Sequence, residues 1–282
     1  MAAKLKKIVL TGAAGRLGSY LREPLTALCD ELVSTDIADQ PGSLYAGETF
    51  VQADLADFAA MEAVIKGADM VVHMGAIVDE KPFEELLGPN FVGSYNVWEA
   101  ASRHGVRRVV YGSSIHAVGM YPKNEFINTE VAHRPDTFYG LAKCFTEDLG
   151  RMYWEKRGLE SVHMRILSCA QVNNARALGS YLSYDDLIQL VTRCIETPVT
   201  GWAVIYGVSN NDRAPVDNAK ASFLGYRPTD NAEIYAEKVL AEEPPMDPHD
   251  PNHMCHGGPF AGVELGQSGL AGMNVIDDSK KS

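Results

Sequence analysis

The sequence predicts an α/β fold built on a doubly wound parallel sheet of the Rossmann type, with a smaller C-terminal region. Strand-like apolar runs alternate with helix-like segments as far as about Leu167, and this alternation is typical of parallel sheets with helices on both faces. A glycine-rich turn joins the first strand-like run to the first helix-like segment. Beyond Leu167 the alternation weakens and Pro and Gly become frequent, which places the smaller region there.

Each expected element follows from its own residue pattern. The strands are short apolar, β-branched runs at Ile8–Thr11, Glu31–Thr35, Met70–Met74, Val109–Ser113, Ser161–Ile166 and Ala203–Tyr206. The helices are the segments Leu17–Leu28, Phe58–Lys66, Phe83–His104 (bent near Gly88-Pro89), Phe138–Arg157 and Tyr184–Glu196. We expect a Rossmann core over 1–167, a substrate-binding region over 168–256 interleaved with the last sheet elements, and a loosely ordered, glycine-rich tail over 257–282.

Composition and charge exclude several classes of protein. No apolar run approaches the ~20 residues that span a bilayer, and the chain runs from Met1 directly into the first strand, so we expect no membrane partner and no signal peptide. The net charge of −12 disfavours nucleic acid as a partner. An odd set of scattered cysteines favours reduced thiols and a cytoplasmic protein. These are Cys29, Cys144, Cys169, Cys194 and Cys255.

The glycine turn has the spacing Gly12-x-x-Gly15-x-x-Gly18 between strand and helix. Gly12 permits a tight turn, Gly15 lets the backbone approach a pyrophosphate, and Gly18 lets the helix pack closely on the sheet. Arg16 and Leu17 open the helix, whose free N–H groups and dipole favour a diphosphate. The turn therefore predicts a dinucleotide site, and its spacing resembles that of the short-chain dehydrogenase/reductase superfamily.

Other residues of the predicted nucleotide site follow later strands. Asp36 ends the second strand, where a carboxylate binds both ribose hydroxyls of NAD and repels the extra phosphate of NADP, so we expect NAD as the cofactor. Gly75-Ala76 closes the next strand with small residues that leave room for the dinucleotide. Asp54-Leu55 resembles the superfamily's adenine-contacting pair.

The chemistry is predicted at Tyr139 and Lys143, which lie four residues apart on one face of a helix. A nearby ammonium favours the phenolate, so Lys143 should lower the pKa of Tyr139 and make it a base for an alcohol proton. Ser114, at the end of the fourth strand, would hold the substrate oxygen, and Ser113 is the less favoured choice. Asn90 matches the helix asparagine that supports the catalytic lysine through water in the superfamily.

A closer resemblance is to the uronate dehydrogenase family, and it extends over about residues 6–262. It is carried by Ser113–Pro122, Arg134–Phe145, Asp217-Asn218, Phe223–Tyr226 and Asp230–Glu233. That family oxidises the C1 hydroxyl of glucuronate or galacturonate with NAD to an aldarolactone. The resemblance implies that His116 bonds a sugar hydroxyl, that Ser168 and Arg176 belong to the substrate loop with the arginine on the sugar carboxylate, and that Phe260 closes over the substrate.

The chain also departs from that family's pattern in its substrate pocket. Ile115 stands where the family has Asn, and Val78 where it has a polar Ser. The arginine loop is one residue shorter and lacks its prolines, and a Trp-Trp-Asp-Asn stretch is reduced to Pro215–Asn218. We therefore expect weaker activity on glucuronate and galacturonate than a typical relative shows, because apolar groups replace hydrogen-bonding ones.

Three other functions remain open from the sequence: a nucleotide-sugar epimerase or dehydratase, a neutral aldose dehydrogenase, and a non-catalytic NAD-sensing module. The Tyr139–Lys143 pair argues against the last of these. Metal-binding residue types cluster near the C-terminus, but without paired spacing, so we expect no metal site. They are His249, His253, Cys255 and His256. We expect a small sugar acid as substrate and a homo-oligomer.

Overall fold

The computed structural model describes residues 4–270 of the protein. Within them, seven strands form one parallel sheet in the order β3-β2-β1-β4-β5-β6-β7. The direction of winding reverses between β1 and β4, and ligands of open α/β sheets bind at such a reversal. The strands are β1 (Leu5–Thr11), β2 (Cys29–Asp36), β3 (Glu48–Gln52), β4 (Met70–His73), β5 (Arg108–Ser114), β6 (Glu160–Ile166) and β7 (Trp202–Gly207).

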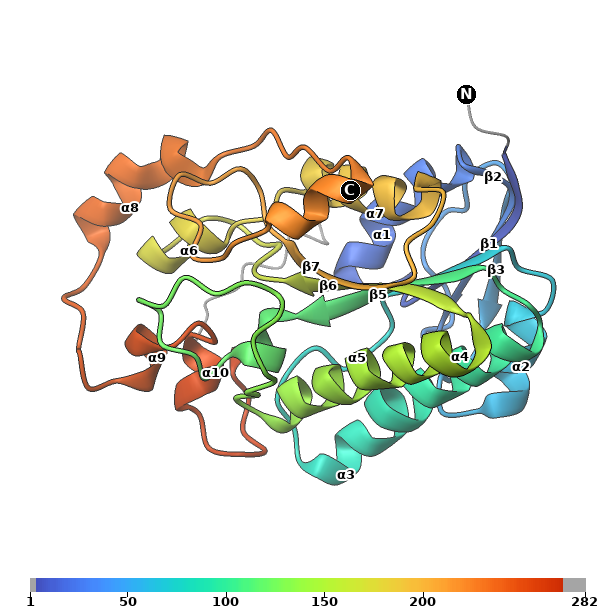
Figure 1. The fold of residues 1–282 in the computed structure, drawn as a ribbon, viewed down its shortest axis with the longest axis horizontal. Helices are drawn as coiled ribbons and strands as arrows, with labels where there is room; N and C mark the ends of the chain where they lie inside the picture. The colour runs from blue at the N-terminus through green and yellow to red at the C-terminus, as the bar shows by residue number, and fades with distance from the viewer. Residues whose placement is uncertain (1–3, 271–282) are drawn as a thin grey trace.

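Helices cover both faces of the sheet, as Figure 1 shows. Successive residues of a strand point to opposite faces, so Ile8 and Leu10 pack with α1 and α7, whereas Val9 faces the core that α2, α4 and α5 complete. The longer helices are α1 (Arg16–Thr26), α2 (Phe58–Ile65), α4 (Gly93–Arg103), α5 (Phe138–Arg157) and α7 (Tyr184–Glu196). Within residues 4–270, no helix is long and apolar enough to cross a membrane.

The expected doubly wound parallel sheet is confirmed, and α5 and α7 have the bounds that the sequence predicts. The bend expected near Gly88-Pro89 takes the form of a π-helical segment, η1 (Leu87–Val92), between α3 (Phe83–Leu86) and α4. Proline lacks an N–H, and a wider helical turn is one way to accommodate the lost hydrogen bond.

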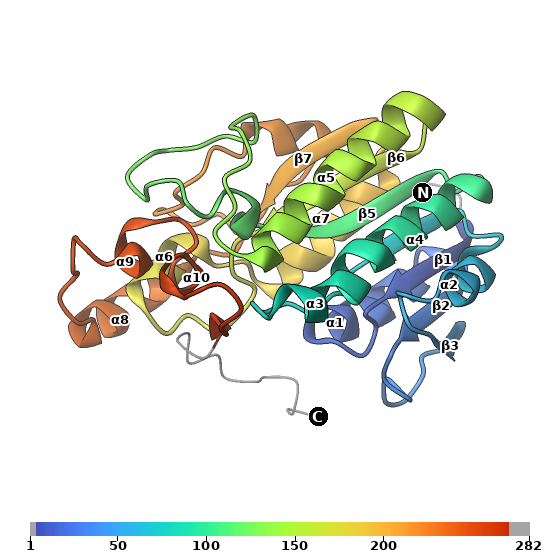
Figure 2. The ribbon, with the colours of Figure 1, turned by 90° about the horizontal axis from the view of Figure 1, so that it is seen from below.

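The chain after β6 builds a cap beyond the carboxyl end of β5, while β7 returns to the sheet (Figures 1 and 2). The cap contains α6 (Ala175–Ser180), α8 (Ala236–Glu242), α9 (Pro251–Met254) and α10 (Pro259–Gly262). Three short 3-10 segments complete the described elements: η2 (Ile115–Val118), η3 (Ala219–Leu224) and η4 (Ala232–Tyr235).

The loosely ordered tail expected from residue 257 onward is wrong as far as Leu270. Phe260 is only 1% exposed, and Asp79 accepts hydrogen bonds from the backbone N–H groups of Gly269 and Leu270 at 3.0 and 3.1 Å. The glycine-rich composition predicted a flexible segment. In the structure, however, the carboxylates of Asp79 and Glu80, in the β4–α3 connection, accept hydrogen bonds from its backbone. The rest of the expected tail, 271–282, lies outside the described residues.

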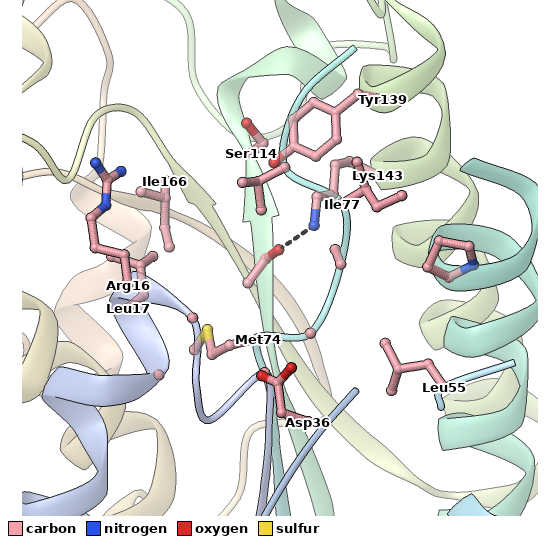
Figure 3. Close-up of a pocket in the computed structure, with 18 of the residues that line it drawn as sticks. Arg16, Leu17, Asp36, Leu55, Met74, Ile77, Ser114, Tyr139, Lys143 and Ile166 are labelled. Carbon is pink, nitrogen blue, oxygen red and sulfur yellow. Dashed lines mark hydrogen bonds between the residues drawn. The ribbon is translucent and has the colours of Figure 1, made fainter. Parts of the chain in front are cut away.

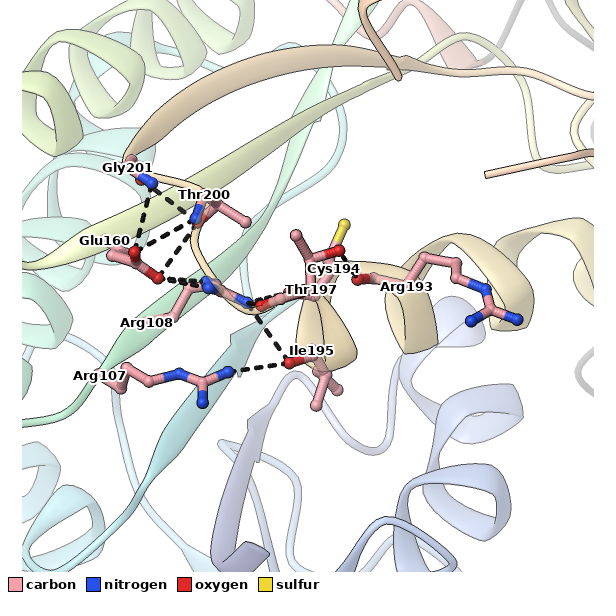
Figure 4. Close-up of polar contacts among 9 residues, drawn as sticks. All are labelled: Arg107, Arg108, Glu160, Arg193, Cys194, Ile195, Thr197, Thr200 and Gly201. Carbon is pink, nitrogen blue, oxygen red and sulfur yellow. Dashed lines mark hydrogen bonds and ion pairs between the residues drawn. The ribbon is translucent and has the colours of Figure 1, made fainter. Parts of the chain in front are cut away.

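At the amino end of the sheet, Arg108 joins β5, β6 and α7 (Figure 4). Its fully buried guanidinium pairs with Glu160 and donates to the carbonyl oxygens of Cys194 and Thr197 at 2.6 and 2.9 Å. A cation that satisfies the last carbonyls of a helix also interacts favourably with the helix dipole. This contact anchors α7 at the end of the sheet opposite the carboxyl edge.

Candidate active site

In the glycine turn after β1, neighbouring backbone atoms lie so close to Gly12 and Gly18 that a side chain at either position would overlap them. Gly12 has a φ of 70°, and a Cβ there would come within 2.6 Å of the Gly75 nitrogen. A Cβ on Gly18 would overlap the Gly12 carbonyl, so α1 packs directly on the turn. Gly15 caps α1 without a side-chain hydrogen bond, which leaves first-turn N–H groups for a ligand. The roles expected for Gly12 and Gly18 in shaping the turn are thus met by the geometry.

A large cavity of about 1180 Å³ begins at this turn and continues to Tyr139 (Figure 3). It lies at the carboxyl ends of β1, β2, β4, β5 and β6, across the reversal in strand order. From the residues expected in the nucleotide site, the structure brings together Gly12, Gly15, Arg16, Leu17, Gly18, Asp36, Asp54, Leu55, Gly75 and Ala76. From the expected catalytic and substrate sites, it adds Val78, Ser114, His116, Tyr139, Lys143, Ser168 and Phe260.

Asp36 is held at the mouth of the nucleotide part of the cavity by two backbone groups. Its carboxylate accepts hydrogen bonds from the N–H of Ala14 at 3.0 Å and from the N–H of Ala38 at 3.1 Å. The first bond ties the end of β2 to the glycine turn. The carboxylate therefore has a fixed position beside the turn, as recognition of a ribose requires.

Tyr139 and Lys143 lie on the face of α5 that meets the end of β5. Thr137 caps the helix, because its side chain accepts a hydrogen bond from the Gly140 N–H at 3.0 Å. The Lys143 ammonium donates to the Gly112 carbonyl at 2.8 Å. Figure 3 marks a hydrogen bond of Lys143 by a dashed line. The same nitrogen lies 5.2 Å from the centre of the Tyr139 ring.

The electrostatics of this pair correct one expectation. Burial raises the pKa of Tyr139 to about 12, and the hydrogen bond from Ser114 opposes this effect only in part. Burial lowers the pKa of Lys143 to about 7. The expectation that Lys143 brings the pKa of Tyr139 below its ordinary value is therefore wrong for the protein alone, because both side chains are withdrawn from water.

His116 is held in the same cavity by a carboxylate that the sequence did not single out. Its Nδ1 lies 2.7 Å from Asp136, whose side chain is fully buried. Asp136 fits there because Gly119 and Gly257 flank it, and a Cβ on either would overlap its carboxylate. The His116 ring stacks on Phe260 with the ring centres 4.0 Å apart. The contact with Asp136 leaves Nε2 as the free nitrogen of the ring.

Three expected residues do not line the large cavity. The Asn90 side chain pairs with both backbone groups of Ile77 at 2.9 Å, so it shapes the loop after β4. Ile115 is 1% exposed within an apolar cluster. The Arg176 side chain does not line the large cavity, and its guanidinium donates a hydrogen bond to the His256 carbonyl at 2.9 Å. Ile115 and Arg176 instead line a neighbouring cavity of about 200 Å³. The roles expected for these three residues remain predictions.

Sequence reasoning also missed Glu80, which is fully buried. Its carboxylate accepts hydrogen bonds from the backbone N–H of Tyr139 and from that of Gly266, each at 2.9 Å. It therefore connects the start of α5 to the C-terminal segment. Asp136 lies within Arg134–Phe145, one of the segments that carry the family resemblance, whereas no local pattern marks Glu80.

The large cavity fits a dinucleotide. It joins a side-chain-free glycine turn, the positive end of α1, and the Asp36 carboxylate to a Ser114–Tyr139–Lys143 set at its far end. The first three features match pyrophosphate and ribose, and the last can accept a proton from an alcohol. The fold and the site together define a dehydrogenase of the short-chain type.

Comparisons with known proteins agree. A sequence model of the NAD dependent epimerase/dehydratase family matches residues 8–171. Uronate dehydrogenase of Pseudomonas putida is 41% identical over 256 residues, which are 90% of this chain and 95% of that protein. The crystal structure of a uronate dehydrogenase mutant from Agrobacterium tumefaciens complexed with NAD has a TM-score of 0.87 at 41% identity, covering 92% of this chain and 98% of that one.

A glucuronic acid dehydrogenase structure from Chromohalobacter salexigens has a TM-score of 0.89 at 39% identity and covers 92% of this chain and 98% of that one. The chain belongs to the NAD-dependent epimerase/dehydratase family. Within that family it belongs with the uronate dehydrogenases, as the resemblance of its motifs implied.

Proposed function

We propose that the protein oxidises the C1 hydroxyl of a hexuronic acid, such as glucuronate or galacturonate, or of a related acidic aldose, to its lactone, with NAD as acceptor. The observation that carries this proposal is the continuous cavity from the glycine turn to Ser114, Tyr139 and Lys143. The names of the relatives support the substrate class and the cofactor. His116 and Phe260 add a hydrogen-bonding ring and an apolar wall that suit a sugar.

Bound NAD supplies the acceptor for the hydride that leaves C1. Tyr139 takes the hydroxyl proton at its phenolic oxygen, and the Ser114 hydroxyl stabilises the resulting charge on the substrate oxygen. Lys143 holds the compensating positive charge beside the phenol, since its ammonium lies on the same helix face. The hydrogen bond to Gly112 keeps that ammonium at the end of β5.

The test is to incubate the purified protein with NAD and a panel of uronic acids and matching neutral aldoses, and to follow NADH by its absorbance. We expect NADH with glucuronate or galacturonate.

The same assay checks the role of Tyr139 as the base. Tyr139→Phe keeps the ring and removes the proton acceptor, so turnover should fall by ~10²-fold or more, the scale of general acid–base catalysis, while NAD affinity stays nearly unchanged. Near-normal turnover in this variant would contradict the mechanism.

We also propose a cytoplasmic homo-oligomer. The five cysteines are all unpaired thiols, which is usual in a reducing compartment. The adjoining segments η1, α4 and α5 expose several large apolar side chains, and such patches commonly mark contacts between protein chains. These are Val92, Tyr95, Leu141 and Phe145.

A further inference from the structure

The smaller cavity, of about 200 Å³, lies beside the catalytic cavity, and Leu167 lines both. The chain passes between the two at the end of β5, because Ser114 lines the large cavity and the next residue, Ile115, lines the small one. The two cavities are therefore neighbours across the Ser114–Ile115 peptide, and Leu167 borders both of them.

Three cationic side chains line this small cavity: Lys123, Arg176 and Arg213. Arg213 is neutralised by Glu233, which it contacts through two nitrogens at 2.7 and 2.8 Å. Among residues 4–270, no carboxylate forms an ion pair with Lys123 or Arg176. The cavity thus carries two positive charges without a contacting counter-charge.

The acidic groups near these two cations are already engaged. Asp136, which acts on Arg176 from a distance, contacts His116 and Thr137 at 2.7 and 2.9 Å. Glu243, which acts on Lys123, accepts a hydrogen bond from the Ala175 N–H at 2.8 Å. Burial, together with the like charge of Arg176, lowers the pKa of Lys123. An anion placed between the two cations would relieve this repulsion.

The number of charges discriminates between anions. A carboxylate carries one negative charge and matches one guanidinium. A phosphate monoester carries about −1.5 to −2 charges at pH 7 and offers three acceptor oxygens, so it matches Lys123 and Arg176 together. The space also suits it, because 200 Å³ is several times the ~30 Å³ that one water occupies in the liquid. Pro215 lines this cavity, and it stands at a position where the uronate dehydrogenase family has Trp.

We propose that the small cavity is a phosphate subsite, and that the protein oxidises aldose phosphates whose phosphate lies between Lys123 and Arg176 while C1 lies at Ser114 and Tyr139. This assignment rests on the proposed function, since the reaction at C1 is the same. The C1–H bond breaks with transfer of hydride to NAD, the hydroxyl proton passes to Tyr139, and the lactone forms. The phosphate ester bond stays intact throughout.

The experiment compares NADH formation from glucose and galactose with that from their 6-phosphates, with glucuronate and galacturonate as reference substrates. For at least one of the two sugars, we expect kcat/KM for the phosphate to exceed that for the neutral sugar by ~10-fold or more, as a charge-assisted contact provides. Inorganic phosphate added with the neutral sugar distinguishes a substrate subsite from a site for free phosphate. It should not raise turnover of the neutral sugar to that of the 6-phosphate.

Lys123→Gln tests the subsite itself, because Lys123 takes no part in the chemistry at C1. It should lower kcat/KM for the preferred sugar phosphate by ~10-fold and leave that for the uronates within about twofold, a difference too small for a lost ionic contact. Lys220→Gln is the matched control: Lys220 pairs with Glu130 outside both cavities and should have no effect on either substrate.

The outcomes separate this proposal from the proposed function. Uronate turnover without a preference for either sugar phosphate over its neutral sugar overturns only the phosphate subsite. The same holds if Lys123→Gln reduces uronate and sugar-phosphate turnover equally, or if inorganic phosphate with the neutral sugar reproduces the effect. Absence of turnover on every sugar overturns the proposed function and the subsite with it.

Discussion

Tyr139 and Lys143 are both buried, and the Lys143 nitrogen lies 5.2 Å from the centre of the Tyr139 ring, so a charge on one side chain acts on the ionisation of the other. With the pKa of Lys143 lowered to about 7 and that of Tyr139 raised to about 12 by burial, the pair loses its first proton near neutral pH. The remaining proton can lie on either the amine or the phenol. The form with phenolate and ammonium accepts the alcohol proton, so base strength depends on the pair and not on Tyr139 alone.

The first prediction at the residue scale is therefore a pH profile. Below about pH 7 the pair holds both protons, so kcat/KM for oxidation should rise about tenfold per pH unit and level off above about pH 7. The Lys143→Met variant lacks the group with a pKa of about 7, so the rise of kcat/KM should move to alkaline pH. Initial rates of NADH formation across this range provide the measurement. An unchanged profile in Lys143→Met would contradict the pairing.

The second residue-scale prediction concerns the cofactor. The fixed Asp36 carboxylate should repel the added phosphate of NADP, which brings nearly two further negative charges, so kcat/KM should favour NAD by ~10-fold or more. Asp36→Asn keeps an acceptor for the Ala14 N–H but loses the charge, and it should narrow the preference mainly by improving the use of NADP. Steady-state kinetics with both cofactors measure this. Equal use of both by the unaltered protein would refute the role of Asp36.

The sequence predicted those site residues whose positions depend only on the local structure around them. Gly12, Asp36 and the Tyr139–Lys143 pair need only a turn, a strand end and a helical spacing. The position of Arg176 depends instead on the path of the loop after β6, which turns its guanidinium into the small cavity. The contact between His116 and Asp136 spans the whole connection from η2 to α5, and no sequence spacing specifies it.

At the scale of elements, α5 is bound to the sheet through a buried carboxylate. Glu147, which is fully buried, accepts hydrogen bonds from Ser113 of β5 at 2.6 Å and from Arg165 of β6 at 3.0 and 2.7 Å. His133 contacts the same carboxylate at 2.8 Å. Burial raises the pKa of Glu147, but the hydrogen bonds from His133 and Arg165 outweigh it and hold that pKa at about 2. This network lies one helical turn after Lys143 and fixes the register of the catalytic helix.

Glu147→Gln should therefore destabilise the fold by about 3–5 kcal/mol, because it leaves Arg165 buried without its counter-charge. The lowered pKa of Glu147 means that its stabilisation is present above its ordinary value of 4.5 and is lost as pH falls toward about 2. Urea unfolding at neutral and acid pH measures both effects. Glu155→Gln breaks an exposed pair with Arg151 and should cost less than about 1 kcal/mol. Similar losses in both variants would contradict the role of burial.

The sequence predicted the long helices better than it predicted irregular segments and short helices. The bounds of α5 follow from Thr137 as cap and Gly158, with a φ of 71°, as the stop. The π-helical segment η1 could be anticipated only as a bend at Pro89, since its form depends on how the segment packs. The short helices of the cap, such as α6, have too few residues to show helical periodicity.

At the scale of the whole molecule, the chain returns from the cap to cover the active site. We call residues 259–270 the C-terminal strap. Phe260 and Leu270 of the strap line the large cavity and pack with Tyr139. Two adjacent carboxylates hold the strap, because Glu80 accepts from Gly266 and Asp79 accepts from Ser268 at 2.5 Å and from the backbone of the next two residues.

The last prediction tests whether this strap closes the sugar end of the cavity. Asp79→Ala removes an acceptor shared by three donors, each contact being worth about 1.5–3 kcal/mol when it involves a charge. Leu270 should then leave the cavity wall for part of the time, and KM for the sugar should rise by ~10-fold. NAD affinity should change little, since the nucleotide end of the cavity lies at the glycine turn. Limited proteolysis should cut the variant faster within the strap.

Glu264→Gln is the control, because it changes an exposed charge on the strap and leaves the contacts of Asp79 intact. It should keep both the KM for the sugar and the proteolysis rate of the unaltered protein. If Asp79→Ala behaved like this control, the strap would be held by the packing of Phe260 alone. If it instead raised KM for NAD and for the sugar equally, Asp79 would support the loop after β4 and not the strap, because that loop also carries Gly75 and Ala76 of the nucleotide site.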